Sequence, residues 1–174
     1  VKEGIIVKDH ILKQYPYRIE LHAHTSPASA CSSLKPEELV KLYYEKGYDG
    51  VVITNHFDPG KFALGKDEAV AAVMRDFQAA KETAKQFGMN VYLGAELRFQ
   101  ENMNDYLIYG VDEDLLRIFY DYIPTDVATF RREVALPNSV FLQAHPFRSG
   151  MVLCDAELLD GMECLNLHPR HNSA

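Results

Sequence analysis

The sequence lacks the features of a membrane or disulfide-bonded protein. No apolar run approaches the ~20 residues that a membrane-spanning helix needs, and the short apolar stretch 4–7 is interrupted at once by charged residues, which excludes a signal-peptide core. Cys31, Cys154 and Cys164 are widely spaced and form no Cys-x-x-Cys pair. We therefore expect a cytoplasmic protein with reduced thiols and no membrane partner, with Cys154 and Cys164 buried and Cys31 in a loop near any site.

An excess of basic residues is also missing. Lys and Arg total 18 against 25 Asp and Glu, which gives a formal net charge of −7 and disfavours a surface that binds duplex nucleic acid. A small anionic substrate stays possible, because bound cations can invert the field of a pocket. Repeats, low-complexity tracts and linkers are absent as well, so we expect one domain over residues 1–174. Nothing in the sequence defines its oligomeric state.

Strand and helix patterns alternate along the chain. Apolar or β-branched runs predict strands at 18–24, 51–53, 91–93, 106–109, 139–144 and 162–167. Helical spacing and capping residues predict helices at 36–46, 67–87, 113–122 and 125–135. Such alternation is typical of a parallel α/β sheet, either open and doubly wound or closed into a barrel.

Metal-ligating side chains follow several of these strands. His22 and His24 are two residues apart at the end of the first strand, so both project from the same face. His56, Glu96 and His145 come at or near the ends of later strands. Imidazoles and carboxylates form zinc, iron and manganese sites. Their spread over several strands favours a closed barrel, in which all strand ends converge.

Four short motifs resemble, in order, those of the PHP (polymerase and histidinol phosphatase) family, whose members are mostly metal-dependent phosphoesterases. They are residues 21–25 (LHAHT), 52–56 (VITNH), 93–97 (LGAEL) and 143–147 (QAHPF). Residues 160–166 (DGMECLN) are similar to the family's next segment. The resemblance implies an α/β fold that is a distorted seven-stranded (β/α) barrel.

The resemblance also implies a metal centre and a reaction. It makes His22, His24, His56, Glu96 and His145 the ligands of two or three divalent ions (Zn, Mn or Fe), with Glu96 bridging two of them. The nucleophile would be a metal-activated water, so no side chain is assigned as catalytic. The substrate would be a small phosphorylated molecule of undefined identity. The alternatives are an amidohydrolase-type metal hydrolase and a degenerate metal-binding domain with a structural or regulatory role.

The chain departs from the family pattern in three places. Asn55 stands where the family usually has Asp, which is expected to weaken the support of His56. Asp105 stands where many members have a further histidine, and is either an oxygen ligand or part of a helix cap or solvated loop. The family's final Asp-x-His is absent and only six strands are predicted, so either the domain is incomplete at its C-terminus with the last strand missing, or part of the site is lost. His168 and His171 are either late ligands or solvated residues.

Three charged residues near the motifs complete the hypothesis. Arg148 follows His145 by three residues and is assigned to substrate binding, because a guanidinium pairs with phosphate in a bidentate manner. Arg98 is assigned a structural role. Glu163 lies in the last predicted strand, where a buried carboxylate needs a cation or hydrogen-bond donors.

Overall fold

A computed structural model describes residues 10–11 and 13–166 of the chain. The strands are β1 (Ile19–Ala23), β2 (Gly50–Ile53), β3 (His56–Phe57), β4 (Asn90–Leu97), β5 (Tyr106–Tyr109), β6 (Val140–Gln143) and β7 (Gly161–Met162). The helices are α2 (Pro36–Glu45), α3 (Pro59–Phe62), α4 (Lys66–Lys85), α5 (Glu113–Tyr122), α6 (Val127–Glu133) and the 3-10 helix η1 (Ala156–Leu158). None of the helices in these ranges is both long and apolar enough to cross a bilayer.

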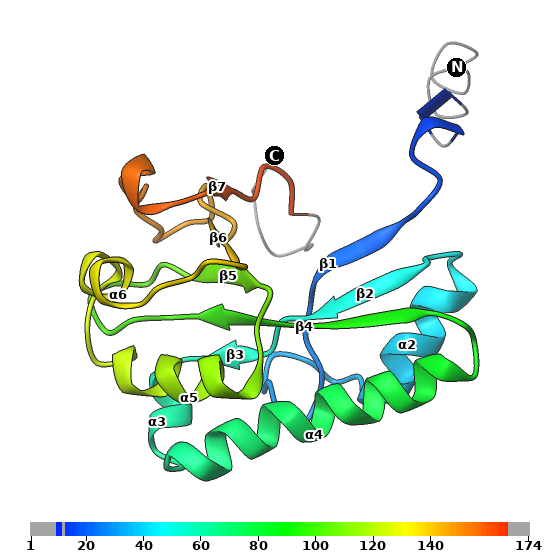
Figure 1. The fold of residues 1–174 in the computed structure, drawn as a ribbon, viewed down its shortest axis with the longest axis horizontal. Coiled ribbons are helices and arrows are strands. Elements are labelled where there is room, and N and C mark those ends of the chain that lie inside the picture. The colour runs from blue at the N-terminus through cyan, green and yellow to red at the C-terminus, as the bar shows by residue number, and fades with distance from the viewer. Residues whose placement is uncertain (1–9, 12, 167–174) are drawn as a thin grey trace.

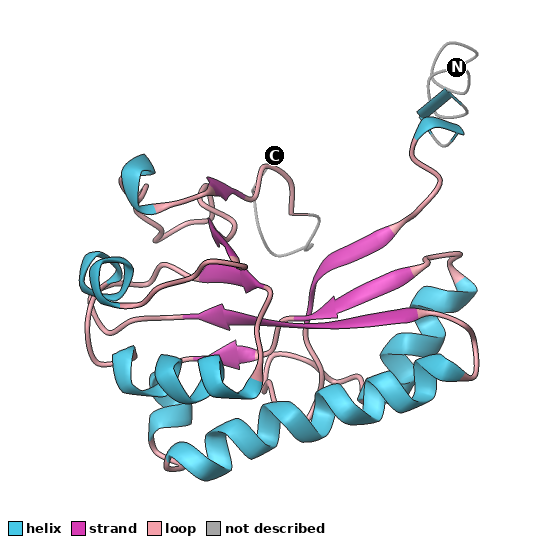
Figure 2. Ribbon diagram, in the orientation of Figure 1, coloured by secondary structure: helices cyan, strands magenta, loops and turns pink. Residues whose placement is uncertain are grey.

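The strands form a curled sheet that resembles half of a barrel (Figure 1). Their order is β1-β2-β4-β5-β6-β7, and β3 pairs with the C-terminal half of β4. Helices α2, α4 and α5 lie along one side of this sheet (Figure 2). Strands β1 and β7 stand at the two ends of the order, and a cavity of about 380 Å³ lies between them, lined in part by Leu21, Tyr109 and Met162. The mixed α/β architecture with its curled sheet is consistent with the expected barrel, while closure of the barrel and the missing last strand stay predictions.

The expectation of an all-parallel sheet is wrong at β5, which runs antiparallel to both β4 and β6. The connection 98–105 is too short for the crossover of a dozen or more residues that parallel neighbours require. Tyr106, at the start of β5, therefore pairs with Leu97 at the end of β4 and with Gln143 at the end of β6. Because of this reversal, Asp105 lies at the same edge of the sheet as the residues that follow the other strands.

Strand β4 changes partners half-way along its length, and this change curls the sheet. Residues 90–93 pair with β2, whereas residues 94–97 pair with β5. Gly94 marks the change: a Cβ there would lie 2.9 Å from Val52 Cγ1 and 3.0 Å from the Ile108 carbonyl oxygen. Only glycine allows the three strands to approach so closely.

Helix α4 covers the sheet with the apolar face that its sequence predicts. Val70, Val73, Phe77 and Ala80 are buried on that face, at the spacing of neighbouring helical turns. The chain leaves the helix through Gly88, whose φ of 62° suits a residue without a Cβ. The other predicted helices also form, with boundaries shifted by two residues at most.

Two predictions near the C-terminus are wrong. The strand expected at 162–167 is reduced to Gly161–Met162, because β7 is an edge strand with one described neighbour, and residues 163–166 follow it as a loop. Cys164 lies in that loop and is exposed rather than buried. Cys154 is half-buried and packs against the larger core cluster. His168 and His171 lie outside the described residues.

Candidate metal centre

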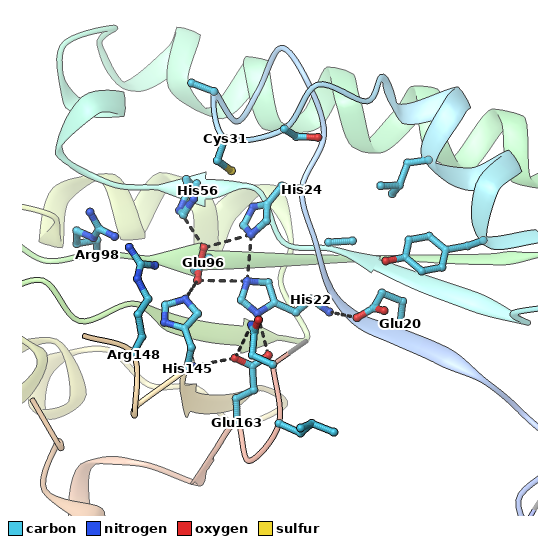
Figure 3. A pocket seen from close by; sticks show the side chains of 17 residues that line it. Glu20, His22, His24, Cys31, His56, Glu96, Arg98, His145, Arg148 and Glu163 are labelled. Carbon is cyan, nitrogen blue, oxygen red and sulfur yellow. Dashed lines mark hydrogen bonds and ion pairs between the residues drawn. The ribbon is translucent and has the colours of Figure 1, made fainter. Parts of the chain in front are cut away.

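The five predicted ligands meet at one edge of the curled sheet. His22 lies in β1 and His24 directly after it, His56 opens β3, Glu96 lies near the end of β4, and His145 follows β6. Figure 3 shows the Glu96 carboxylate in the middle of the four imidazoles. Residues from four strands, up to 123 positions apart in the sequence, thus form one cluster.

Each carboxylate oxygen of Glu96 faces its own pair of histidines. Oε1 lies 3.2 Å from His22 Nε2 and 3.0 Å from His145 Nε2. Oε2 lies 3.3 Å from His24 Nε2 and 2.9 Å from His56 Nδ1. The two pairs also approach each other, because the Nε2 atoms of His22 and His24 are 3.0 Å apart. In this arrangement the carboxylate could bind one cation with each of its two oxygens.

Several of these atoms are buried without the hydrogen bonds that burial normally demands. Glu96 is 1% exposed, and its Oε2 has no hydrogen-bond donor, although His56 Nδ1 lies 2.9 Å away. His24 Nδ1 is likewise buried without a hydrogen-bond partner. Buried polar groups without partners cost free energy. Imidazole nitrogens and carboxylate oxygens are the ligands of which zinc, iron and manganese sites are built. The donor set therefore fits divalent cations.

Glu163, directly after β7, supports two of the predicted ligands. Its Oε1 accepts a hydrogen bond from His22 Nδ1 at 3.0 Å, and its Oε2 accepts one from the His145 backbone N–H at 2.8 Å. The second bond holds His145 at a φ of 28°, a left-handed conformation that non-glycine residues rarely adopt. Asn166 Nδ2 donates to the same carboxylate at 3.1 Å. Glu163 thus has the hydrogen-bond donors that its sequence position requires.

The charges in the cluster are strongly coupled. Burial lowers the pKa of His22, but Glu163 and Glu96 outweigh it and raise the pKa to about 10. Burial likewise opposes the effects of Cys31 and Glu96 on His56, which together raise its pKa to about 10. Burial lowers the pKa of His24 to about 3, against the attraction of Glu96. Without a cation, protons on imidazoles therefore balance the buried carboxylate.

Asp105 lies beside this cluster and is paired with arginine. It is fully buried, which excludes the solvated-loop alternative. Arg98 binds it through Nε and Nη2, both at 2.7 Å, so the structural role expected for Arg98 agrees with its contacts. His145 Nε2 lies 3.6 Å from the same carboxylate. Burial raises the pKa of Asp105 against the opposing effect of Arg98.

Arg148 lies beside the same cluster and is held less tightly than Arg98. A tight turn, in which the Arg148 N–H donates to the His145 carbonyl at 3.0 Å, brings its side chain back toward the cluster. Its Nη1 lies 3.7 Å from Asp105 Oδ2, too far for a hydrogen bond. Figure 3 shows the Arg148 side chain beside His145 and Glu96. Arg148 therefore keeps hydrogen-bonding capacity for a ligand.

The loop between β1 and α2 is fixed by a buried polar network. Asn55 Oδ1 accepts from the Thr25 N–H at 2.8 Å and from Ser29 Oγ at 2.9 Å, and Asn55 Nδ2 donates to Thr25 Oγ1 at 2.7 Å. The expected support of the His56 ring by residue 55 is not among these contacts. Asn55 instead holds the loop, and Ser29 Oγ accepts from the His56 N–H at 2.9 Å.

Sequence reasoning missed two further members of this network. Asp76 accepts from Thr25 Oγ1 at 2.8 Å and from the Ala28 N–H at 3.1 Å. Lys61 is also buried, and its Nζ donates to the Ala28 carbonyl. A signal existed for Asp76, which interrupts the apolar stripe of α4 between Val73 and Ala80. A buried acid in such a stripe predicts a polar partner. No comparable signal marks Lys61.

A cavity of about 870 Å³ opens over the cluster. The metal-ligand candidates, Arg98, Arg148 and Glu163 line one part of it. Leu39, Tyr43 and Leu165 line it as well, as does Glu20. The cavity thus has polar and apolar side chains in its lining.

The sequence of this chain matches the family model of the PHP domain over residues 20–163. The chain belongs to the PHP family. The match extends from β1 to Glu163 and includes all five predicted ligands as well as Arg148. A search of curated proteins gave no significant match. The family's final Asp-x-His motif is absent from the sequence.

Solved structures of the same fold come from two bacteria. One is a two-domain protein from Bacteroides vulgatus containing a predicted PHP-like metal-dependent phosphoesterase, with 18% identity and a TM-score of 0.54 over 75% of this chain. The other is a proposed metal-dependent phosphoesterase from Bifidobacterium adolescentis, with 13% identity and a TM-score of 0.54 over 85% of this chain. This chain covers 35% of the first protein and 77% of the second.

Proposed function

We propose that this PHP domain is a metal-dependent hydrolase that cleaves phosphate esters. The observation that carries the proposal is the position of Glu96, whose two oxygens each face two histidines in a buried cluster. His22 and His145 would hold one cation with Oε1, and His24 and His56 a second with Oε2. Asp105 and Glu163 lie at the margins of the cluster and add negative charge.

Divalent cations held by these residues would polarise a phosphoryl oxygen, lower the pKa of a water that could serve as the nucleophile, and neutralise developing charge. The chain's own contribution is positioning. Glu163 fixes the His22 ring through Nδ1, which leaves Nε2 facing Glu96. Glu96 itself cannot rotate freely, because it is buried among four imidazoles. These contacts hold the candidate ligands in place before a substrate binds.

The two arginines would have different roles. Arg98 is occupied by Asp105 through two short hydrogen bonds, so it holds that carboxylate in place. Arg148 makes only the long contact with Asp105 and can turn its guanidinium toward non-bridging phosphate oxygens. Planar, bidentate recognition of phosphate is the contact that arginine supplies best.

Charge also bears on the role of the cations. Glu96, Asp105 and Glu163 place three carboxylates at the site, and in the metal-free protein Arg98 and the protonated His22 and His56 offset them. Divalent cations that displace the imidazole protons would add positive charge beside Arg148. We therefore expect a phosphate ester to bind more tightly to the metal-loaded protein.

The size of the cavity also bears on the alcohol part of the phosphate ester. Its volume of about 870 Å³ exceeds what a phosphate group fills, so an organic group has room beside Leu39, Tyr43 and Leu165. We propose a small phosphorylated molecule with an apolar or aromatic portion. The negative charge of the surface disfavours duplex nucleic acid as a substrate.

A direct test offers the zinc- or manganese-loaded protein three aryl substrates that differ in the bond to be cleaved. Hydrolysis of an aryl phosphate, with no cleavage of the matching aryl amide or aryl ester of acetic acid, is the expected result. Cleavage of the amide alone would assign the site to amidohydrolase-type chemistry. No turnover of any of the three, with metal stoichiometrically bound, would instead favour a metal-binding domain without catalysis.

A further inference from the structure

The loop after β1 is held far more firmly than a surface connection requires. Asn55, Asp76 and Lys61, from three different segments, bind its backbone and side chains. Within the loop, the Ser29 N–H donates to the Thr25 carbonyl at 2.8 Å. Burying this many polar groups is costly unless each is paired. The loop is therefore built to hold one conformation at the edge of the site.

That conformation brings Cys31 to the metal centre. Its Sγ and one ring nitrogen each of His24 and His56 lie within 4.8 Å of one another. Figure 3 shows the thiol on the side of these two imidazoles that faces away from His22 and Glu163. Cys31 also lines the cavity that opens over the cluster.

A second observation points to a cation in this corner. Glu96 Oε2 is the carboxylate oxygen that faces His24 and His56, and it is buried without a hydrogen-bond donor. Its counterpart Oε1 does take part in a hydrogen-bonding contact, with His145 Nε2 at 3.0 Å. The corner nearest the thiol thus contains a buried carboxylate oxygen that has ion-pair contacts with two imidazoles but no well-aligned hydrogen bond, beside a sulfur atom.

We propose that the Cys31 thiolate is a metal ligand, which together with His24, His56 and Glu96 Oε2 forms a thiolate-containing position for a zinc-class cation. The inference rests on the metal centre of the proposed function, and not on the phosphate ester as its substrate. It assigns a different ligand chemistry to each half of the site. The half with His22 and His145 has nitrogen and oxygen donors alone.

The chemistry of sulfur makes the two halves selective for different cations. A thiolate favours zinc over manganese, whereas a nitrogen and oxygen set accepts either. Binding requires loss of the thiol proton, which a coordinated cation promotes outright. Ligand atoms of a tetrahedral zinc site lie roughly 3.3–3.8 Å apart. The limit of 4.8 Å among Cys31 Sγ and the nitrogens of His24 and His56 is compatible with that range.

Cobalt substitution tests the sulfur ligand by spectroscopy. The chelated protein, reloaded with Co²⁺, should show a sulfur-to-cobalt charge-transfer band in the near ultraviolet. Cys31→Ser should abolish that band, while the matched control Cys164→Ser should keep it. Cys164 suits this purpose because it is exposed and does not line the main cavity. A band of equal intensity in Cys31→Ser would overturn the proposal.

Thiol protection tests the same ligand in the unmodified chain and does not depend on a variant that folds. Alkylation of Cys31, followed by peptide mass, should slow at least about tenfold on adding zinc and remain unchanged on adding manganese. Cys164 should react at one rate throughout. Zinc-independent alkylation of Cys31 would refute the inference.

The Cys31 ligand and the proposed hydrolysis of phosphate esters can be refuted independently of each other. A cobalt–thiolate band in a protein that hydrolyses no phosphate ester would leave Cys31 as a ligand and remove the proposed reaction. Metal-dependent hydrolysis without that band would do the reverse.

Discussion

Glu163 and His22 form a hydrogen bond of 3.0 Å between Oε1 and Nδ1, although 141 residues separate them in the chain. The bond joins β1 to the loop after β7, the two ends of the strand order. It also sets which nitrogen of His22 faces the cluster. A carboxylate that orients a metal-bound imidazole in this way typically matters for metal affinity as much as some ligands do.

The first prediction follows from that contact. Glu163→Ala should weaken metal binding about 10–100-fold, because it frees both the His22 ring and the His145 backbone. Competition with a chromophoric chelator measures the affinity. Glu157→Ala, at an exposed position of η1, serves as the control and should bind metal like the wild type. Equal affinities for the two variants would show that Glu163 does not orient the ligands.

Metal binding should release protons. In the metal-free protein the pKa values of His22 and His56 are raised to about 10. Both imidazoles are therefore protonated on both nitrogens and positively charged at pH 7. A cation must displace those protons, and roughly one to two should leave per chain. Apparent affinity should therefore rise with pH from 7 toward 10. His24, with a pKa of about 3, is already neutral and adds no dependence in that range. Calorimetry in buffers of different ionisation enthalpy counts the protons, and binding enthalpies that do not vary with buffer would contradict this charge state.

Arg148→Ala should lower kcat/KM. The loss should correspond to about 1–3 kcal/mol of transition-state stabilisation, the scale of a lost charge-assisted hydrogen bond. Its metal content should not change, because Arg148 is not among the candidate ligands. Steady-state kinetics on an aryl phosphate, with elemental analysis of the same sample, gives both values. Unchanged kinetics would remove Arg148 from substrate binding while leaving the metal centre intact.

Asn55→Asp should lower the free energy of unfolding by roughly 1–3 kcal/mol. Asn55 Nδ2 donates to Thr25 Oγ1, whose own proton is donated to Asp76. An aspartate at position 55 would place an acceptor against an oxygen that has no proton left to give. Urea denaturation measures the loss. A variant as stable as the wild type would mean that the network re-forms with a different pattern of donors.

Much of the fold was predictable because its signals are local. The apolar stripe of α4 and the aspartate that caps α5 can both be recognised from short stretches of the sequence. Helix α5 forms within the predicted bounds. The direction of β5 depends instead on how a short connection meets β4 in space. The two-residue β3 is too short to produce a periodic pattern.

The residues of the site likewise differ in how far the sequence could predict them. Strand ends in an α/β fold gather on one edge, so the five candidate ligands could be named from sequence. The pairing of Asp105 with Arg98, and the reach of the loop that carries Cys31, arise from side-chain contacts across the fold. Asp105 was predictable only as one of several alternatives. The cytoplasmic location and the missing last strand stay predictions.

Simultaneous measurement of metal content and phosphatase activity tests the central claim most directly. The wild-type protein should carry roughly two or more divalent ions per chain, lose its aryl phosphatase activity with them on chelation, and regain both when zinc or manganese is added. The His22→Ala, His24→Ala double variant should retain few ions and no activity. Activity that survives complete removal of metal, or equal metal content in the wild type and the double variant, would contradict the account.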